Sequence, residues 1–133
     1  MDFKNANELL TLCEEQNISI SEVMRNREII TGECPAKEAD QKMARVLEIM
    51  KEAARSPIEK PIRSMGGLIG GEAQKLAHHS ASGQGLCGEL LEKAITYAMA
   101  TLETNASMGL IVASPTAGSA GIVPGLLLAF QEV

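Results

Sequence analysis

The chain has 133 residues, of which 45% are hydrophobic, and it carries a formal net charge of −5. This length suits one domain with a moderate core, and the apolar content excludes a disordered chain. An acidic surface repels phosphates, so nucleic acid is not an expected partner. Aromatic residues make up only 2% of the chain. A core built from Leu, Ile, Val, Met and Ala favours an all-α fold in which helices pack on helices.

Residues 1–56 predict a lead-in of three helices. The first two begin at capping-box patterns, and Gly32 is expected to end the second helix in the left-handed conformation. The third helix has apolar residues at steps of three and four, the strongest periodicity of the chain. Ser56-Pro57 is expected to stop it, because a residue before proline disfavours the helical region. The capping pairs are Asn5 with Glu8 and Ser19 with Glu22.

Residues 57–133 form a glycine-rich part, which together with residues 1–56 makes a single domain in this interpretation. Eleven of the twelve glycines lie between Gly66 and Gly125. The run Met65–Gly71 predicts a loop that opens a helix at Glu72. A second glycine-rich connection leads into a long helix. The apolar side of that long helix is expected to carry Leu86, Leu90, Ala94, Tyr97, Ala98 and Thr101.

No charged residue occurs from Thr104 to Gln131. Prolines and glycines interrupt this stretch too often for a membrane span, so no membrane association is expected. Long uncharged stretches are usually buried in soluble proteins. Because the stretch runs almost to the end of the chain, we expect that the natural protein continues beyond Val133 or that a partner chain covers this end.

The segment Ser114–Gly121 is the best candidate for a ligand site, on the residues alone. Its small side chains let the backbone approach a ligand closely, and Thr116 and Ser119 add hydroxyl groups. A helix that starts near Ser119 would direct free N–H groups and its dipole toward a carboxylate or phosphate. The same pattern fits a tight turn between two buried elements, and spacing alone does not decide between the two.

Two further positions are weaker candidates. The run Ser64–Gly71 forms either a second backbone cradle before a helix or a flexible connection. It does not match the phosphate-binding pattern of nucleotide sites. Asn105 either caps a helix or orients the loop beside a ligand.

The histidines and cysteines predict no metal site and no catalytic residue. His78 and His79 are adjacent, so on a helix they point about 100° apart and cannot easily share a metal. The three cysteines match no ligand spacing and are interpreted as reduced thiols of a cytoplasmic protein. They are Cys13, Cys34 and Cys87. The N-terminus shows no secretory signal.

Several of these runs together resemble the α chain of iron–sulfur-dependent L-serine dehydratase. Glu103–Gly109 followed by Ser114–Gly125, which contains PTAGSAG, is similar to the most specific element of that family. Met65–Leu76 resembles its TGLTGGDAxKL element, and Ser82–Gly88 its SGxxLxG connection. The resemblance covers residues 57–133 by motif and the lead-in by pattern.

The resemblance implies an activity, a cofactor and partners. The family removes water from L-serine to give pyruvate and ammonia, with a 4Fe–4S cluster as Lewis acid and without pyridoxal phosphate. The cluster cysteines of the family lie beyond the stretch that this sequence matches, so the chain looks like the first half of an α chain. A β chain or domain completes the enzyme, which is expected to be an oligomer. Alone, the chain is expected to be inactive.

The resemblance also assigns the substrate-binding role to residues of the two small-residue runs. The competing class is a non-catalytic helical interaction module, in which Ile122–Phe130 is an interface and the glycine turns serve packing. A reading frame that continues past Val133 into a Gly- and Cys-rich segment would favour the enzyme. The predicted substrate contacts are Ser64, Gly66, Gly67, Gly70, Gly71, Asn105, Thr116, Ala117, Gly118 and Ser119.

Overall fold

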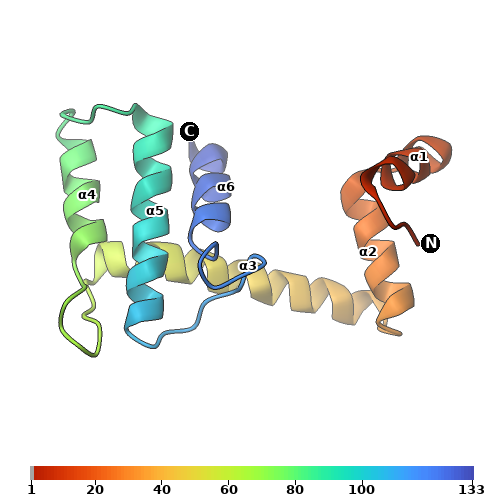
Figure 1. The fold of residues 1–133 in the computed structure, drawn as a ribbon, viewed down its shortest axis with the longest axis horizontal. Helices are drawn as coiled ribbons and strands as arrows, with labels where there is room; N and C mark the ends of the chain where they lie inside the picture. Colours follow the sequence, from red (N-terminus) through yellow and green to blue (C-terminus); the bar gives the residue numbers. More distant parts are fainter. Residues whose placement is uncertain (1) are drawn as a thin grey trace. The chain divides into compact units, whose positions relative to one another are not determined.

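The computed structural model describes residues 2–133, and this part of the chain contains six α-helices and no β-strand (Figure 1). The all-α prediction is therefore confirmed. The chain divides into two compact units, the first ending at Arg45 and the second running from Val46 to Val133. The helices are α1 (Ala6–Gln16), α2 (Ile20–Thr31), α3 (Ala36–Glu59), α4 (Glu72–Ala81), α5 (Glu89–Ala106) and α6 (Ile122–Glu132).

Both predicted capping pairs begin helices of the first unit, and the second of them forms the complete capping box. The Glu8 N–H donates to the side-chain oxygen of Asn5 at 3.0 Å, at the start of α1. At the start of α2, the Ser19 N–H donates to Glu22 at 2.9 Å and the Glu22 N–H donates back to the Ser19 hydroxyl. Local hydrogen bonding therefore determines where these two helices begin.

Gly32 follows the last residue of α2 as predicted, but the left-handed conformation predicted for it is wrong. Gly32 has φ −85° and continues the helical conformation, whereas Glu33 has φ 47° and adopts the left-handed one. The Gly32 N–H donates to the Glu28 carbonyl at 2.8 Å, and the Cys34 N–H donates to Ile29 at 3.2 Å. The turn that closes the helix therefore places its left-handed position on Glu33, although glycine is the residue that adopts this conformation most easily.

The prediction that Ser56-Pro57 stops the third helix is also wrong, because Pro57 lies inside α3 and is fully buried. A proline in a helix leaves the carbonyl four residues earlier without its usual donor. Here that carbonyl belongs to Ala53, and it accepts a hydrogen bond from the Thr104 hydroxyl of α5 at 3.0 Å. A tertiary contact thus satisfies the group that would otherwise end the helix.

In the second unit, α4, α5 and α6 lie side by side, and the C-terminal half of α3 crosses them (Figure 1). The core cluster joins one residue of α3 with two residues each of α5 and α6. Helices α5 and α6 approach closely, because Gly121 and Gly125 lie against the backbone of Ala98. The core cluster consists of Ala54, Ala94, Tyr97, Leu128 and Ala129.

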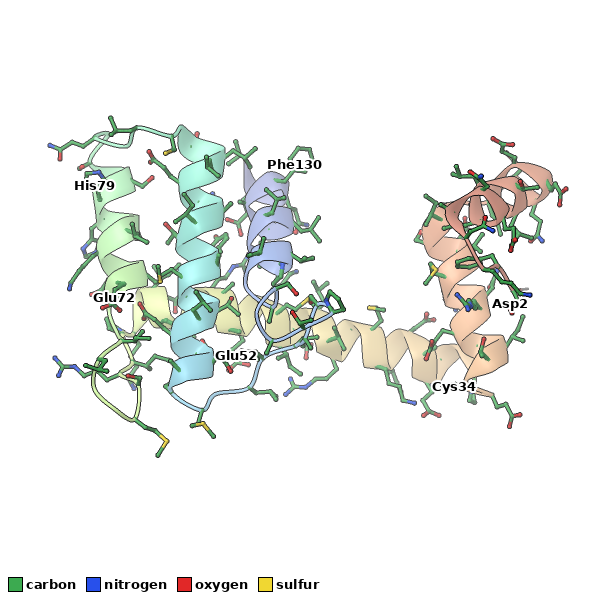
Figure 2. The ribbon with its side chains drawn as sticks, in the orientation of Figure 1. Asp2, Cys34, Glu52, Glu72, His79 and Phe130 are labelled. Carbon is green, nitrogen blue, oxygen red and sulfur yellow. The ribbon has the colours of Figure 1, made fainter. Side chains whose placement is uncertain are left out.

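The uncharged stretch near the C-terminus is only partly buried, which corrects the expectation of burial. Leu128 and Ala129 face the core, whereas Phe130 is 74% exposed and points away from α6 (Figure 2). Leu86 does not join the long helix either, because α5 begins at Glu89 and Leu86 is 98% exposed. Among residues 2–133, no helix is long and apolar enough to cross a membrane.

A charged cluster fastens the end of α6 to its neighbours. Glu132 accepts a hydrogen bond from the Tyr97 hydroxyl at 2.5 Å and forms ion pairs with Arg55 and Lys93. The Tyr97 hydrogen bond, with help from Arg55 and Lys93, lowers the pKa of Glu132 to about 2. The cluster therefore joins α3, α5 and α6 through one carboxylate.

Candidate functional site

The two predicted ligand-binding runs lie at the same end of the helical layer, where α4 begins, α5 ends and α6 begins (Figure 1). We call residues 60–71 the first loop and residues 107–121 the second loop. Figure 2 shows Glu72 at this end of α4 and His79 at the opposite end. In residues 2–133, no hydrogen bond joins the two loops directly.

The tip of the first loop is closed by bonds within itself. The Ser64 N–H donates to the Ile69 carbonyl at 2.8 Å, and the Ile69 N–H donates to the Ser64 hydroxyl at 3.1 Å. The Gly67 N–H donates to the Ser64 carbonyl at 2.9 Å. Gly66 and Gly67 are exposed at the tip. The Ser64 hydroxyl thus shapes the loop, and Gly66 retains an N–H that no group in the described chain accepts.

The last two glycines of the first loop donate to carboxylates of the protein itself. The Gly70 N–H donates to Glu72 at 2.6 Å, and the Gly71 N–H donates to Glu103 at 3.1 Å. Glu103 also accepts from the Ala73 N–H at 2.7 Å. Internal carboxylates therefore occupy the donors of Gly70 and Gly71 at the start of α4.

This arrangement favours the ionised form of the Glu72 side chain at the start of α4. Hydrogen bonds from its own N–H and from Gly70 lower the pKa of Glu72, and the neighbouring Glu103 side chain adds to this. An anion at a helix N-terminus is also stabilised by the helix dipole. Glu72 and Glu103 therefore neutralise the positive end of α4.

Sequence reasoning missed Glu103, which is 1% exposed. A signal for it exists: on a helix, Glu103 falls on the same face as Thr96 and Ala100, at steps of four and three. Both of these small residues are buried. A lone acidic residue on a face of small buried residues indicates an internal carboxylate with donors to satisfy it.

In the second loop, the Thr116 and Ser119 side chains hydrogen-bond to each other, with their hydroxyl oxygens 2.9 Å apart. Each hydroxyl also accepts the other residue's N–H at 3.3 Å. The Ser119 hydroxyl lies 2.7 Å from the Ser114 carbonyl. These bonds make the turn a preformed unit, so a ligand would meet hydroxyls that are already oriented.

The donors of this turn are at its apex and not at a helix start, which corrects the predicted helix start near Ser119. Helix α6 begins at Ile122, and the N–H groups of Ile122 and Val123 both donate to the Ser119 carbonyl. In the described chain, the N–H groups of Ala117 and Gly118 make no hydrogen bond, and both residues are exposed. Two adjacent free donors therefore lie between the Thr116 and Ser119 hydroxyls.

Two polar side chains near the second loop have no hydrogen bond among residues 2–133. Asn105 lies in the last turn of α5 and is exposed, and its carbonyl, not its amide group, accepts the Met108 N–H at 3.0 Å. The Ser114 hydroxyl is buried without a partner. Ser114 lies within the predicted candidate segment but was not among the predicted substrate contacts. Its unpaired hydroxyl adds a polar group to the base of the second loop.

A cavity lies at the other end of the layer, away from both loops. It measures about 570 Å³ and is lined by residues of α4, α5 and the connection between them, including Ser80, Glu92 and Tyr97. Glu92 accepts the Ser80 hydroxyl at 2.7 Å and the Cys87 N–H at 3.2 Å. Its carboxylate is therefore used to shape that connection.

The described residues do not fit an iron–sulfur cluster. No group of three or more His, Cys, Asp or Glu side chains within residues 2–133 is arranged to hold a metal ion. Cys13 lies in α1, Cys34 precedes α3, and Cys87 is exposed in the connection before α5. His78 and His79 both lie in the last turn of α4.

The geometry defines an all-α segment with two small-residue turns at one end, one of which holds internal carboxylates and one of which has free donors. The family model described as "Serine dehydratase alpha chain" matches residues 15–133. The chain therefore belongs to the serine dehydratase α-chain family. No solved structure matches the chain.

Named relatives support the same assignment. The chain is 42% identical over 130 residues to "Probable L-serine dehydratase, alpha chain" of Bacillus subtilis, covering 98% of this chain and 43% of that protein. It is 35% identical over 127 residues to "L-serine dehydratase, alpha chain" of Peptoniphilus asaccharolyticus, covering 96% and 44%. For "L-serine dehydratase" of Helicobacter pylori, the identity is 32%, covering 96% and 28%. The chain thus spans less than half the length of these relatives.

Proposed function

We propose that the chain is the substrate-binding part of an L-serine dehydratase, an ammonia-lyase that converts L-serine to pyruvate and ammonia. The observation that carries this proposal is the second loop, where two free N–H groups lie between two oriented hydroxyls. The family match over residues 15–133 supplies the substrate that such a turn would hold.

The second loop suits the carboxylate of a small amino acid. The N–H groups of Ala117 and Gly118 are adjacent donors, and a carboxylate has two oxygens to accept them. Thr116 and Ser119 flank these donors with hydroxyls that hydrogen-bond to each other and fix the shape of the turn. Preoriented dipoles hold an anion rigidly without a bulky cationic side chain, which leaves room for the reacting carbon atoms.

The first loop and Asn105 belong to the same proposal as a second wall of the site. Gly66 and Gly67 are exposed at the tip and contribute backbone without side chains. Ser64, Gly70 and Gly71 act through the shape of the loop, because their polar groups already bond within the chain. Asn105 lies in the last turn of α5, just before the second loop, and its side-chain amide has no hydrogen bond in the described chain.

The complete enzyme, in this proposal, holds a 4Fe–4S cluster through residues outside the chain, uses no pyridoxal phosphate, and includes a β chain or domain. The described cysteines do not fit the cluster, so no chemical step is assigned to them. The chain supplies binding and orientation of L-serine in the cytoplasm, within an oligomer. The reaction belongs to amino-acid catabolism and yields a precursor for gluconeogenesis.

The first test asks whether the chain needs the rest of the enzyme. Purified chain treated for cluster reconstitution and given L-serine should form no pyruvate, whereas the complete dehydratase that contains it should form pyruvate. Pyruvate formation by the isolated chain would contradict the proposal that this chain only binds L-serine and that the rest of the enzyme is needed for the reaction.

The second test concerns the turn itself. In the complete enzyme, Thr116→Val combined with Ser119→Ala should raise the KM for L-serine about tenfold or more, since each lost hydrogen bond contributes on the order of 1 kcal/mol. The control is Thr116→Ser with Ser119→Thr, which keeps both hydroxyls. Unchanged kinetics in the first variant would contradict the carboxylate role.

A helical interaction module is the second candidate function, and the exposed apolar face of α6 favours it. Ile122, Leu127 and Phe130 are 63%, 63% and 74% exposed. The turn variants distinguish the two functions. Under the module alternative, they leave L-serine kinetics unchanged, whereas charged substitutions on this face of α6 abolish association with the partner.

A further inference from the structure

Glu103 is the only buried charged residue in the described chain, with 1% of its surface exposed. It lies on α5, three residues before the end of that helix. Burying a carboxylate is costly unless strong donors replace the water that it loses. The position of Glu103 therefore needs a structural reason.

The donors of Glu103 come from the start of α4, 30 residues earlier in the chain. One carboxylate oxygen accepts the Ala73 N–H at 2.7 Å, and the other accepts the Gly71 N–H at 3.1 Å. The residue at the N-cap of α4 is Gly71, which has no side chain to cap the helix. Glu103 thus supplies from another helix the capping that α4 lacks locally.

The backbone at the end of the first loop, just before α4, is also constrained. Gly70 has φ 148°, and a Cβ at this position would lie 2.1 Å from the Ile62 carbonyl oxygen. Its N–H donates to Glu72. The N–H groups of Gly70, Gly71 and Ala73 therefore all donate to carboxylates, one to Glu72 at the start of α4 and two to Glu103 of α5.

We propose that Glu103 is a positioning residue, whose buried carboxylate on the Gly71 and Ala73 N–H groups holds the first loop in the orientation that the substrate site requires. This inference rests on the proposed function, in which the first loop is one wall of that site. Gly70 and Gly71 donate to carboxylates of the chain, so their contribution to the site is the placement of the loop tip. Glu103 acts on L-serine through this placement and does not touch it.

The test combines amide hydrogen exchange with kinetics on the complete dehydratase. In the unchanged enzyme, the Gly71 and Ala73 amides should exchange at least about tenfold more slowly than free amides. Glu103→Gln should lose this protection at one of the two amides at least, because its carboxamide keeps one acceptor oxygen and places an NH2 donor against the other N–H. The KM for L-serine should rise about tenfold with a smaller change in kcat. Protection within α6 should stay as it was.

The matched control is Glu89→Gln, the same chemical change on an exposed residue of the same helix. It should leave both exchange and kinetics unchanged. If Glu103→Gln does not fold, Glu103→Asp replaces it, since this shorter side chain keeps the charge but not the reach. Lost protection with a raised KM in Glu103→Asp supports the proposal.

Three outcomes would overturn the proposal. The first is rapid exchange of the Gly71 and Ala73 amides in the unchanged enzyme, and the second is wild-type protection in the Glu103 variant. The third is lost protection with an unchanged KM, which would make Glu103 purely structural. Absence of pyruvate formation by the unchanged complete enzyme would refute the proposed function instead, and the exchange data would still decide whether Glu103 holds the loop.

Discussion

The two glycine-rich loops have similar compositions and lie at the same end of the helical layer. Their backbone N–H groups nevertheless differ in whether they are hydrogen-bonded. In the first loop, Gly70 and Gly71 donate to carboxylates of the chain. In the second loop, the donors of Ala117 and Gly118 have no partner in the described chain. Similar small-residue runs thus build one closed anion site and one open turn.

The difference shows that a glycine-rich run before a helix does not by itself define a ligand site. At the exit of the first loop, Glu72 and the buried Glu103 accept the donors of Gly70 and Gly71. The second loop closes upon its own hydroxyls and leaves its apex free. Partner groups from elsewhere in the fold decide which of the two loops keeps free backbone donors.

The largest expected effect is a difference in stability between glycine-to-alanine substitutions in the two loops. Gly70→Ala should lower the free energy of unfolding by at least about 2 kcal/mol, because a Cβ there meets the Ile62 carbonyl and φ is unfavourable. The matched change Gly118→Ala should stay within about 0.5 kcal/mol. The nearest atom to a Cβ at Gly118 is 3.8 Å away. Urea unfolding followed by circular dichroism measures both, and equal losses would contradict the comparison.

The next effect tests how the second loop is anchored. A Cβ at Gly121 would lie 2.7 Å from the Ala98 carbonyl oxygen, at the close approach of α5 and α6. Gly121→Ala should therefore cost about 1–3 kcal/mol of stability and displace the turn. In the complete enzyme it should also raise the KM for L-serine. A stable variant with wild-type kinetics would show that the α5–α6 contact does not place the turn.

A smaller effect concerns the charged cluster that fastens α6. The folded-state pKa of Glu132 is about 2, below its usual 4.5, so its contribution is complete above pH 4.5 and is lost as the pH falls toward 2. Glu132→Gln should destabilise the chain by about 1 kcal/mol at pH 7, since the group is partly exposed to solvent. Urea unfolding from pH 7 to 3 should show the difference between the two proteins shrinking. A constant difference would refute this assignment.

The smallest expected effect is on stability and concerns the buried hydroxyl of Ser114 in the second loop. The Ser114 hydroxyl is buried without a partner, so Ser114→Ala removes an unsatisfied group and should leave stability unchanged or raise it by up to about 1 kcal/mol. Thermal unfolding of the two proteins is the measurement. A clear loss of stability would mean that this hydroxyl has a partner that supports the turn.

Local patterns predicted much of the helical framework. The capping pairs at Ser19 and Glu22, and the helix that opens at Glu72, are in the structure as expected. Both depend on bonds between residues a few positions apart, which are visible in the sequence. Pro57 was misjudged because Thr104, far along the chain, satisfies the carbonyl that the proline leaves free.

The residues of the second loop could be singled out from their types, but the location of its donors could not. The helix was expected near Ser119, whereas the Ser119 carbonyl accepts the first N–H groups of α6 and moves the free donors to Ala117 and Gly118. In the first loop, the sequence suggested a backbone cradle or a flexible connection, and it did not show which groups the loop's donors meet. The carboxylates at Gly70 and Gly71 are those of Glu72 and Glu103.

The sequence by itself determined the helical class, most helix starts and the two small-residue runs, because these follow from composition and from bonds between near neighbours. Through its motifs it also pointed to the serine dehydratase α chain, to which the chain belongs. Only the tertiary structure decided which backbone donors are satisfied and which are free. A buried donor bonds to whatever acceptor the fold brings near, and for the first loop that acceptor is on α5, some 30 residues away.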